Sequence, residues 1–322
     1  SNGITDSGSV TVRGTSSFQT TGAGANIDLG TSTLGDGNGT DTVTLHTTAA
    51  VTGGGDATVD NAATVLVLGD GTSVSGSALV TSVGGELKVT TGANITDSAT
   101  VTVGRKFWGI TDDNNGTIVM GTLSISDGGT IKLATEGSGG ATVVNANGLA
   151  FETSSIGGDL VATATNGDIT QNGVLDINGA SSFQTSTSGK HISLTQANAL
   201  GDGSGTDTIT LNTSGTLGYV KLITTGGTDA LAFGTSAASL ATSVGGYLTI
   251  TARSAIADSH GLTITGDTTI SAVNSSGVKK NVTLGNTSNG FADAVEITGQ
   301  VVEIDGGTTK LKIGTSTIGG DL

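Results

Sequence analysis

The chain has 322 residues, of which 55 are Gly, none are Pro, none are Cys and only 12% are charged. The lack of Cys excludes disulfides, thiol nucleophiles and thiolate zinc sites. The formal charge is −15, from 12 Lys and Arg against 27 Asp and Glu. We do not expect such a chain to bind nucleic acid, because phosphate binding needs clustered positive charge. No apolar run approaches the roughly 18 residues of a membrane span, so we expect no transmembrane segment.

Short stretches of alternating apolar and polar residues recur along the chain. They consist mostly of Val, Ile, Leu and Thr, and their period of two is typical of a half-buried strand. Gly, Asn, Asp and Ser fill the segments between them, as in turns. The sequence therefore predicts an all-β protein of many short strands, with clear examples at 42–45, 101–103, 208–211, 248–251 and 262–265.

The chain contains two copies of one long repeat. Residues 153–160 (TSSIGGDL) recur at 315–322 (TSTIGGDL), so the second copy follows the first at a distance of half the chain. Shorter motifs within each copy repeat the same elements. We therefore expect two continuous super-repeats, residues 1–160 and residues 161–322.

Two architectures fit such a repeat, a solenoid and a string of β-sandwich (Ig-like) domains. The absence of Pro favours the solenoid, because nearly every strand N–H of a parallel β-helix pairs with the next coil. Sandwiches would also be expected to carry a buried Trp or Tyr in each domain, whereas the chain has one Trp and two Tyr. We predict a right-handed parallel β-helix of about 16 coils, with about 20 residues per coil.

Residues 157–183 and their counterpart at 84–104 carry a family resemblance. They resemble the repeats of filamentous-haemagglutinin-like and related giant bacterial surface proteins, over most of the chain but at the level of repeats and composition. Members of that family form right-handed parallel β-helices that are exported to the cell surface or matrix. The resemblance implies a structural segment of a large secreted bacterial protein, acting as a rigid spacer or filament in adhesion or cell aggregation. The expected partners are neighbouring repeats, further copies of the protein and extracellular polysaccharide.

A duplicated Gly-rich loop is the candidate metal site. Residues 36–44 resemble the calcium-binding nonapeptide of RTX proteins, with Asp36 in place of the first Gly. Calcium prefers six to eight oxygen ligands, which Asp, Asn and backbone carbonyls supply. The alternative is a turn whose Asp side chains cap backbone N–H groups. The calcium hypothesis names Asp36, Asn38 and Asp41 in the first copy and Asp202, Ser204 and Asp207 in the second.

Residues 105–108 (RKFW) interrupt the repeat, because the second copy has GDTT at 266–269. Phe107 and Trp108 beside basic residues predict a patch that binds a glycan or another partner. A carbohydrate-binding module on a β-helix is therefore the alternative function. In the other interpretation, these aromatic side chains cover an adjacent coil.

Catalysis is the least favoured function. Some parallel β-helices cleave acidic polysaccharides with clustered Asp residues beside His, Arg or Lys, so a lyase or hydrolase is a further alternative. Here the three His are scattered, at 46, 191 and 260, and Asp112 and Asp113 lack a recognisable partner. We predict that the protein is not an enzyme.

Overall fold

The computed structural model describes residues 3–48, 54–62, 65–72, 76, 78–201, 208–225, 230–234 and 241–322. Every regular element in these ranges is a β-strand. The chain divides into two compact units, Ser1–Gly158 and Asp159–Leu322. Within these ranges there is no helix that is long and apolar enough to cross a membrane.

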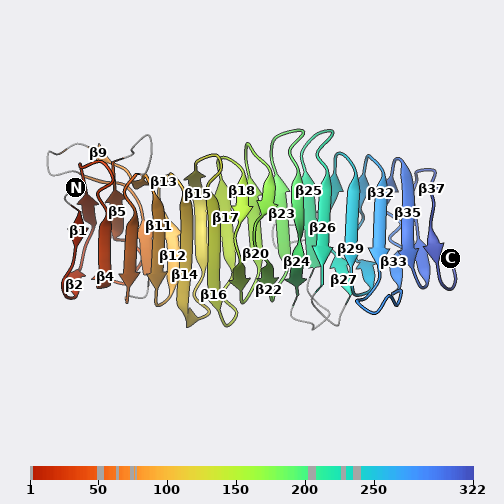
Figure 1. The fold of residues 1–322 in the computed structure, drawn as a ribbon, viewed down its shortest axis with the longest axis horizontal. Coiled ribbons are helices and arrows are strands. Elements are labelled where there is room, and N and C mark those ends of the chain that lie inside the picture. Colours follow the sequence, from red (N-terminus) through yellow and green to blue (C-terminus); the bar gives the residue numbers. More distant parts are fainter. Residues whose placement is uncertain are drawn as a thin grey trace. The chain divides into compact units, whose positions relative to one another are not determined.

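The strands of the first unit form two parallel sheets, A and B, and the chain passes between them in each turn (Figure 1). Sheet A contains β1 (Ile4–Thr5), β2 (Val10–Val12), β4 (Ile27–Leu34), β6 (Ala57–Asn61), β11 (Glu86–Thr91), β14 (Lys106–Asn114), β16 (Thr130–Glu136), β18 (Leu149–Phe151) and β19 (Ser154–Ile156). Sheet B contains β3 (Ser16–Gln19), β5 (Thr42–His46), β7 (Val65–Leu68), β10 (Ser82–Val83), β12 (Asn94–Asp97), β13 (Val101–Val103), β15 (Ile118–Ile125) and β17 (Ala141–Asn145). Two short strands, β8 (Gly71–Thr72) and β9 (Ala78–Leu79), pair with each other in antiparallel fashion outside the two sheets.

The second unit is built in the same way. Its sheet A contains β21 (Ile169–Gln171), β22 (Leu175–Ile177), β24 (Ile192–Leu200), β26 (Val220–Thr224), β29 (Leu248–Ala252), β32 (Thr268–Ala272), β35 (Ala294–Gly299), β37 (Lys312–Ile313) and β38 (Thr317–Ile318). Its sheet B contains β20 (Leu160–Ala164), β23 (Ser181–Thr185), β25 (Thr208–Thr213), β27 (Leu231–Phe233), β28 (Ser243–Val244), β30 (Ile256–Asp258), β31 (Thr263–Ile264), β33 (Val282–Leu284), β34 (Gly290–Phe291) and β36 (Val302–Ile304).

The pairing within each unit is that of a β-solenoid, and the described residues of the two units make about 12 turns. Leu248 pairs with Thr268 in the next turn, and Ala57 pairs with Leu87 across a longer stretch of chain. The predicted parallel β-helix is confirmed, and the tandem sandwiches are excluded because the two sheets of each unit pair in parallel. The predicted number of coils was too high, because loops between strands make many turns longer than the prediction assumed.

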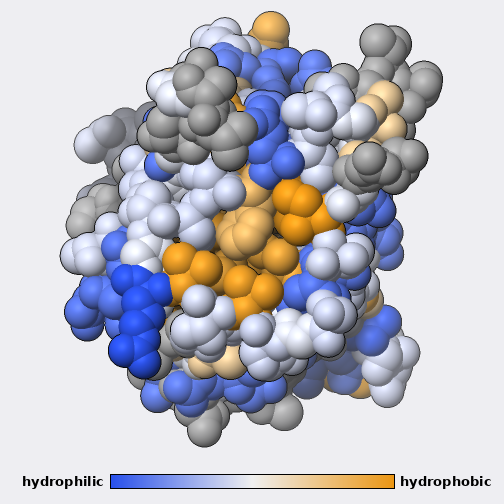
Figure 2. All heavy atoms as spheres, turned by 90° about the vertical axis from the view of Figure 1, so that its left-hand side faces the viewer, coloured by the Kyte–Doolittle hydropathy of each residue, from blue (hydrophilic) through white to orange (hydrophobic). Residues whose placement is uncertain are grey.

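The core of each unit lies between its two sheets. Inward-pointing residues such as Ile27, Leu87 and Phe107 are almost completely buried. Figure 2 looks onto the N-terminal end of the first unit and shows apolar side chains gathered in the middle, with hydrophilic residues around them. Ile4 and Val10 in the first turn are only half-buried. The alternation that predicted strands therefore also separates core from surface.

Buried asparagine side chains bond backbone N–H groups near the ends and irregularities of strands. The side-chain oxygen of each accepts a hydrogen bond from a backbone N–H in another turn, at 2.8–3.0 Å. An unpaired buried N–H costs free energy, so these amides stabilise bends that the sheet ladder leaves unpaired. The residues are Asn61, Asn145, Asn198 and Asn289, which are at most 2% exposed.

Candidate functional site

A row of basic and aromatic side chains lies on the outer face of sheet A in the first unit. Lys88 on β11 pairs in register with Trp108 on β14, which pairs with Lys132 on β16. The Lys88 and Lys132 ammonium groups lie 4.5 Å and 4.3 Å from the centroid of the Trp108 ring. Lys106, which precedes the tryptophan on the same face of β14, lies 5.0 Å from it. We call Lys88, Lys106, Trp108 and Lys132 the Lys–Trp stack.

One carboxylate neutralises part of this charge. The Lys106 ammonium lies 2.8 Å from Glu152, and the Thr130 hydroxyl donates a hydrogen bond to Glu152 at 2.8 Å. Partial burial acts to raise the pKa of Glu152, but these two hydrogen bonds and the charges of Lys106 and Lys132 outweigh it and lower the pKa below its ordinary value. Glu152 is therefore held ionised beside the stack.

The structure separates the two aromatic residues that the sequence grouped together. Trp108 is half-buried on the outer face, whereas Phe107 is 0% exposed and belongs to the core. Phe107 is thus unavailable to a partner, and its predicted place in a surface patch was wrong. The physical reason is that successive residues of a strand point to opposite faces. The Trp108 side chain remains a candidate, although Lys88 and Lys132 lie over its ring.

The second unit carries another stack on its own sheet A. The rings of His191 and Tyr219 stack with centroids 3.9 Å apart, and those of Tyr219 and Tyr247 stack at 4.7 Å. These residues directly precede β24, β26 and β29, so the parallel register aligns them. The Tyr219 N–H donates a hydrogen bond to His191 Nδ1 at 3.2 Å. Lys221 lies 5.3 Å from the Tyr219 centroid.

The first copy of the Gly-rich loop is held by its own acidic side chains. The Asn38 N–H and side-chain amide donate to the two carboxylate oxygens of Asp36, at 2.9 Å and 2.8 Å. The Asp36 N–H donates to Asp41 at 3.1 Å. The bond from the Asn38 N–H is the main reason that the pKa of Asp36 is lowered. These bonds are those of the capping interpretation, and calcium binding by Asp36, Asn38 and Asp41 stays a prediction.

The second copy of that loop, with Asp202, Ser204 and Asp207, lies outside the described residues. In the ranges that the structure does describe, no three His, Asp or Glu side chains lie close enough together to hold a metal ion.

The three histidines lie in separate places. His46 Nδ1 is 3.1 Å from the Val80 carbonyl, His191 belongs to the aromatic stack, and His260 Nδ1 is 3.3 Å from the Ser259 hydroxyl. Asp112 lies near other acids rather than near a histidine. Burial, reinforced by the charges of Asp60 and Glu136, raises its pKa, and Lys88 acts in the opposite direction.

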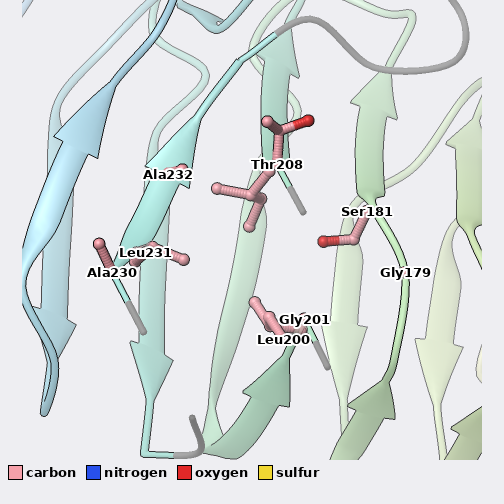
Figure 3. A pocket seen from close by; sticks show the side chains of 9 residues that line it. Gly179, Ser181, Leu200, Gly201, Thr208, Ala230, Leu231 and Ala232 are labelled. Atoms are coloured by element: carbon pink, nitrogen blue, oxygen red, sulfur yellow. The ribbon is translucent and has the colours of Figure 1, made fainter. Parts of the chain in front are cut away.

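A small cavity in the second unit is lined by β23, β25 and β27 (Figure 3). Its walls include the Ser181 and Thr208 hydroxyls and the side chains of Leu200 and Leu231. The volume of about 10 Å³ is room for about one water molecule. The cavity is too small to bind a sugar residue.

Sequence reasoning missed Lys88 and Lys132 because they lie on other turns, far from Trp108 along the chain. A signal was present. The segments Glu-Leu-Lys-Val, Lys-Phe-Trp-Gly and Thr-Ile-Lys-Leu each place a basic or aromatic residue between two inward positions. Aligning those segments by turn would have brought the lysines to the tryptophan.

Comparison with known protein families gives one finding. The family described as "Repeats of unknown function (DUF5649)" matches residues 138–226 and 222–298, which together cover half of the chain. No curated protein and no solved structure matches the sequence.

Proposed function

The chain belongs to the DUF5649 family of repeats, and from this repetitive construction we propose that it is a structural segment of a large secreted bacterial surface or extracellular-matrix protein. It serves as a rigid spacer or filament in adhesion or cell aggregation. Its partners are neighbouring repeats of the same protein and further copies of it.

The observation that carries this proposal is the continuous parallel pairing within each unit. In the first unit, Ala57 pairs with Leu87, which pairs with Phe107, which pairs with Ile131. Each turn hydrogen-bonds the turns beside it, so bending or stretching a unit requires breaking several ladder bonds together. Stability in such a protein is approximately a sum over neighbouring turns, and length can increase without a new fold. These are the properties that a spacer needs.

The charge of the chain supports the same role. Its formal charge of −15 makes copies repel one another in low salt, and this repulsion is screened as salt is added. Divalent cations would then bridge copies more effectively than monovalent ions. Aggregation of cells that carry the protein is therefore expected to depend on the ions present.

The proposal is tested by displaying the chain on a bacterium that does not aggregate, then measuring cell sedimentation and attachment. The control carries Gly55→Val and Gly104→Val, because a Cβ at these positions would collide with the backbone carbonyls of Ala25 and Gly84 in neighbouring turns. We expect the native chain to cause sedimentation and the control, displayed at equal density, not to. Equal sedimentation of both strains would contradict a role that depends on the stacked fold.

A carbohydrate-binding role is the second candidate, and the Lys–Trp stack is the observation that favours it.

A further inference from the structure

Positive charge is concentrated in one place in the first unit. Four of the 12 basic residues of the chain, Lys88, Arg105, Lys106 and Lys132, belong to or directly precede three successive strands of sheet A. Arg105 is paired with Asp56 at 2.5 Å and Lys106 with Glu152 at 2.8 Å. Within the described part of the chain, no carboxylate lies within ion-pair distance of Lys88 or Lys132. Two ammonium groups are therefore left for an external anion.

The acidic neighbours do not fill this site. Glu86 pairs in register with Lys106, which already bonds Glu152. Asp112 interacts electrostatically with Lys88, and also with the acidic Asp60 and Glu136. It lies further along β14 than Trp108. The intervening outward row is Thr90, Ile110 and Ala134, which pair in register and are half-buried. Ile110 and Ala134 therefore form a small apolar surface beside Trp108 and Lys132, before Asp112.

The arrangement around Trp108 holds the lysines in position. Three ammonium groups lie around one ring, each 4.3–5.0 Å from its centroid, although like charges repel one another. Attraction to the face of the indole ring offsets part of that repulsion. The Trp108 Nε1 is also buried and has no hydrogen-bond partner. Carboxylates that bind the individual ammonium groups would relieve the repulsion that the ring only partly offsets.

We propose that the Lys–Trp stack binds an acidic polysaccharide through its carboxylates, that is, a polymer of uronic acid. Lys88 and Lys132 lie two turns apart, which is roughly 9–10 Å at the spacing of adjacent strands. A polymer presents several carboxylates and so reaches both lysines, whereas a single small anion reaches one. The apolar edges of its sugar rings lie against Ile110 and Ala134. This inference rests on the proposed function, because a surface or matrix protein meets such polymers outside the cell. It adds the chemical class of the partner.

The chain offers its own probe for the test, because Trp108 is its only tryptophan. The purified chain is titrated with polygalacturonate in low salt while Trp108 emission is recorded. We expect a saturable change in emission, which weakens as salt is added and is absent with a neutral glucan. Lys88→Gln with Lys132→Gln is expected to weaken binding by about tenfold or more, the loss of two charge-assisted contacts.

The matched control is Lys279→Gln with Lys280→Gln, which removes the same charge from another part of the chain. We expect it to bind nearly as tightly as the native chain, and thermal melting establishes that all three proteins fold. Absence of binding by the native chain would overturn the proposal. So would equal weakening in both double variants, or an equal response to the neutral glucan.

The display assay separates the two proposals. If the native chain does not bind polyuronate but still causes cells to sediment, only the proposed binding site is overturned. Polyuronate binding without fold-dependent sedimentation overturns the spacer role and leaves the site standing.

Discussion

Phe107 and Gly109 share the inner face of β14, where a Cβ added to Gly109 would lie 3.2 Å from the Phe107 ring. The same added atom would lie 3.2 Å from Ile118 Cδ1. Phe107 is completely buried, so its ring cannot turn away into solvent. The glycine therefore provides the space that the large ring occupies between the two sheets.

The first prediction concerns this pair. Gly109→Ala is expected to destabilise the protein by about 1–3 kcal/mol, because overpacking a close-packed core forces its neighbours to shift. Gly14→Ala is the control, since nothing lies within 4 Å of a Cβ there. Urea unfolding of both variants checks the prediction. Equal midpoints for the two would show that the core absorbs the methyl group at no cost.

The second prediction is a stabilising substitution in the second unit. The Thr268 side chain is completely buried, and its hydroxyl has no hydrogen-bond partner. Thr268→Val keeps the shape and removes the unpaired polar atom, so we expect a gain of roughly 1 kcal/mol. The control is Thr269→Val at the neighbouring exposed position, which should change the melting temperature little. A lower melting temperature for Thr268→Val would mean that the hydroxyl is bonded in solution.

The third prediction concerns pH. The folded protein raises the pKa of Asp112, chiefly by burial and then by the charges of Asp60 and Glu136. Folding therefore favours the protonated carboxyl, and the ionised group costs stability at neutral pH. This cost is relieved as pH falls through the folded pKa towards the unfolded value of about 3.8.

Asp112→Asn is accordingly expected to raise the melting temperature at pH 7, with the gain shrinking as the solution is acidified. Asp113→Asn removes the same charge from the adjacent residue and serves as the control. Melting curves across this pH range check the prediction. A gain that is equal in both variants, or that does not change with pH, would place its origin in net charge rather than in Asp112.

The fourth prediction separates calcium binding from capping in the loop of Asp36. Because the Asp36 carboxylate accepts two hydrogen bonds from Asn38, we expect Asp36→Ala to lower the melting temperature equally in calcium and in chelator. Asp28→Ala, on an exposed position of β4, controls for loss of charge. If the native chain melts higher in calcium and Asp36→Ala abolishes that rise, the calcium interpretation holds instead.

Much of the fold could be predicted from the sequence because its signals are local. Alternation such as Leu248-Thr249-Ile250 marks strands, and the lack of Pro distinguishes a stacked ladder from sandwiches. The number of turns was harder to predict. It depends on loop lengths, which vary because a loop outside the ladder is free to lengthen at little cost.

The site was only partly predictable. The interruption of the repeat at 105–108 drew attention to Trp108, but treating Phe107 as its surface neighbour ignored strand alternation. Lys88 and Lys132 join the tryptophan through register alone, which no local pattern reveals. Asn61 and Asn145 are similar, because Asn is a residue type that is typical of turns. Only the structure shows that they bond backbone groups inside the core.

The turn-by-turn pairing has a consequence for how such a protein changes over generations. A duplicated or deleted whole turn meets the same kind of neighbour on both sides, so the remaining contacts survive the event. Recombination between similar gene segments can therefore lengthen or shorten the product without passing through a version that fails to fold.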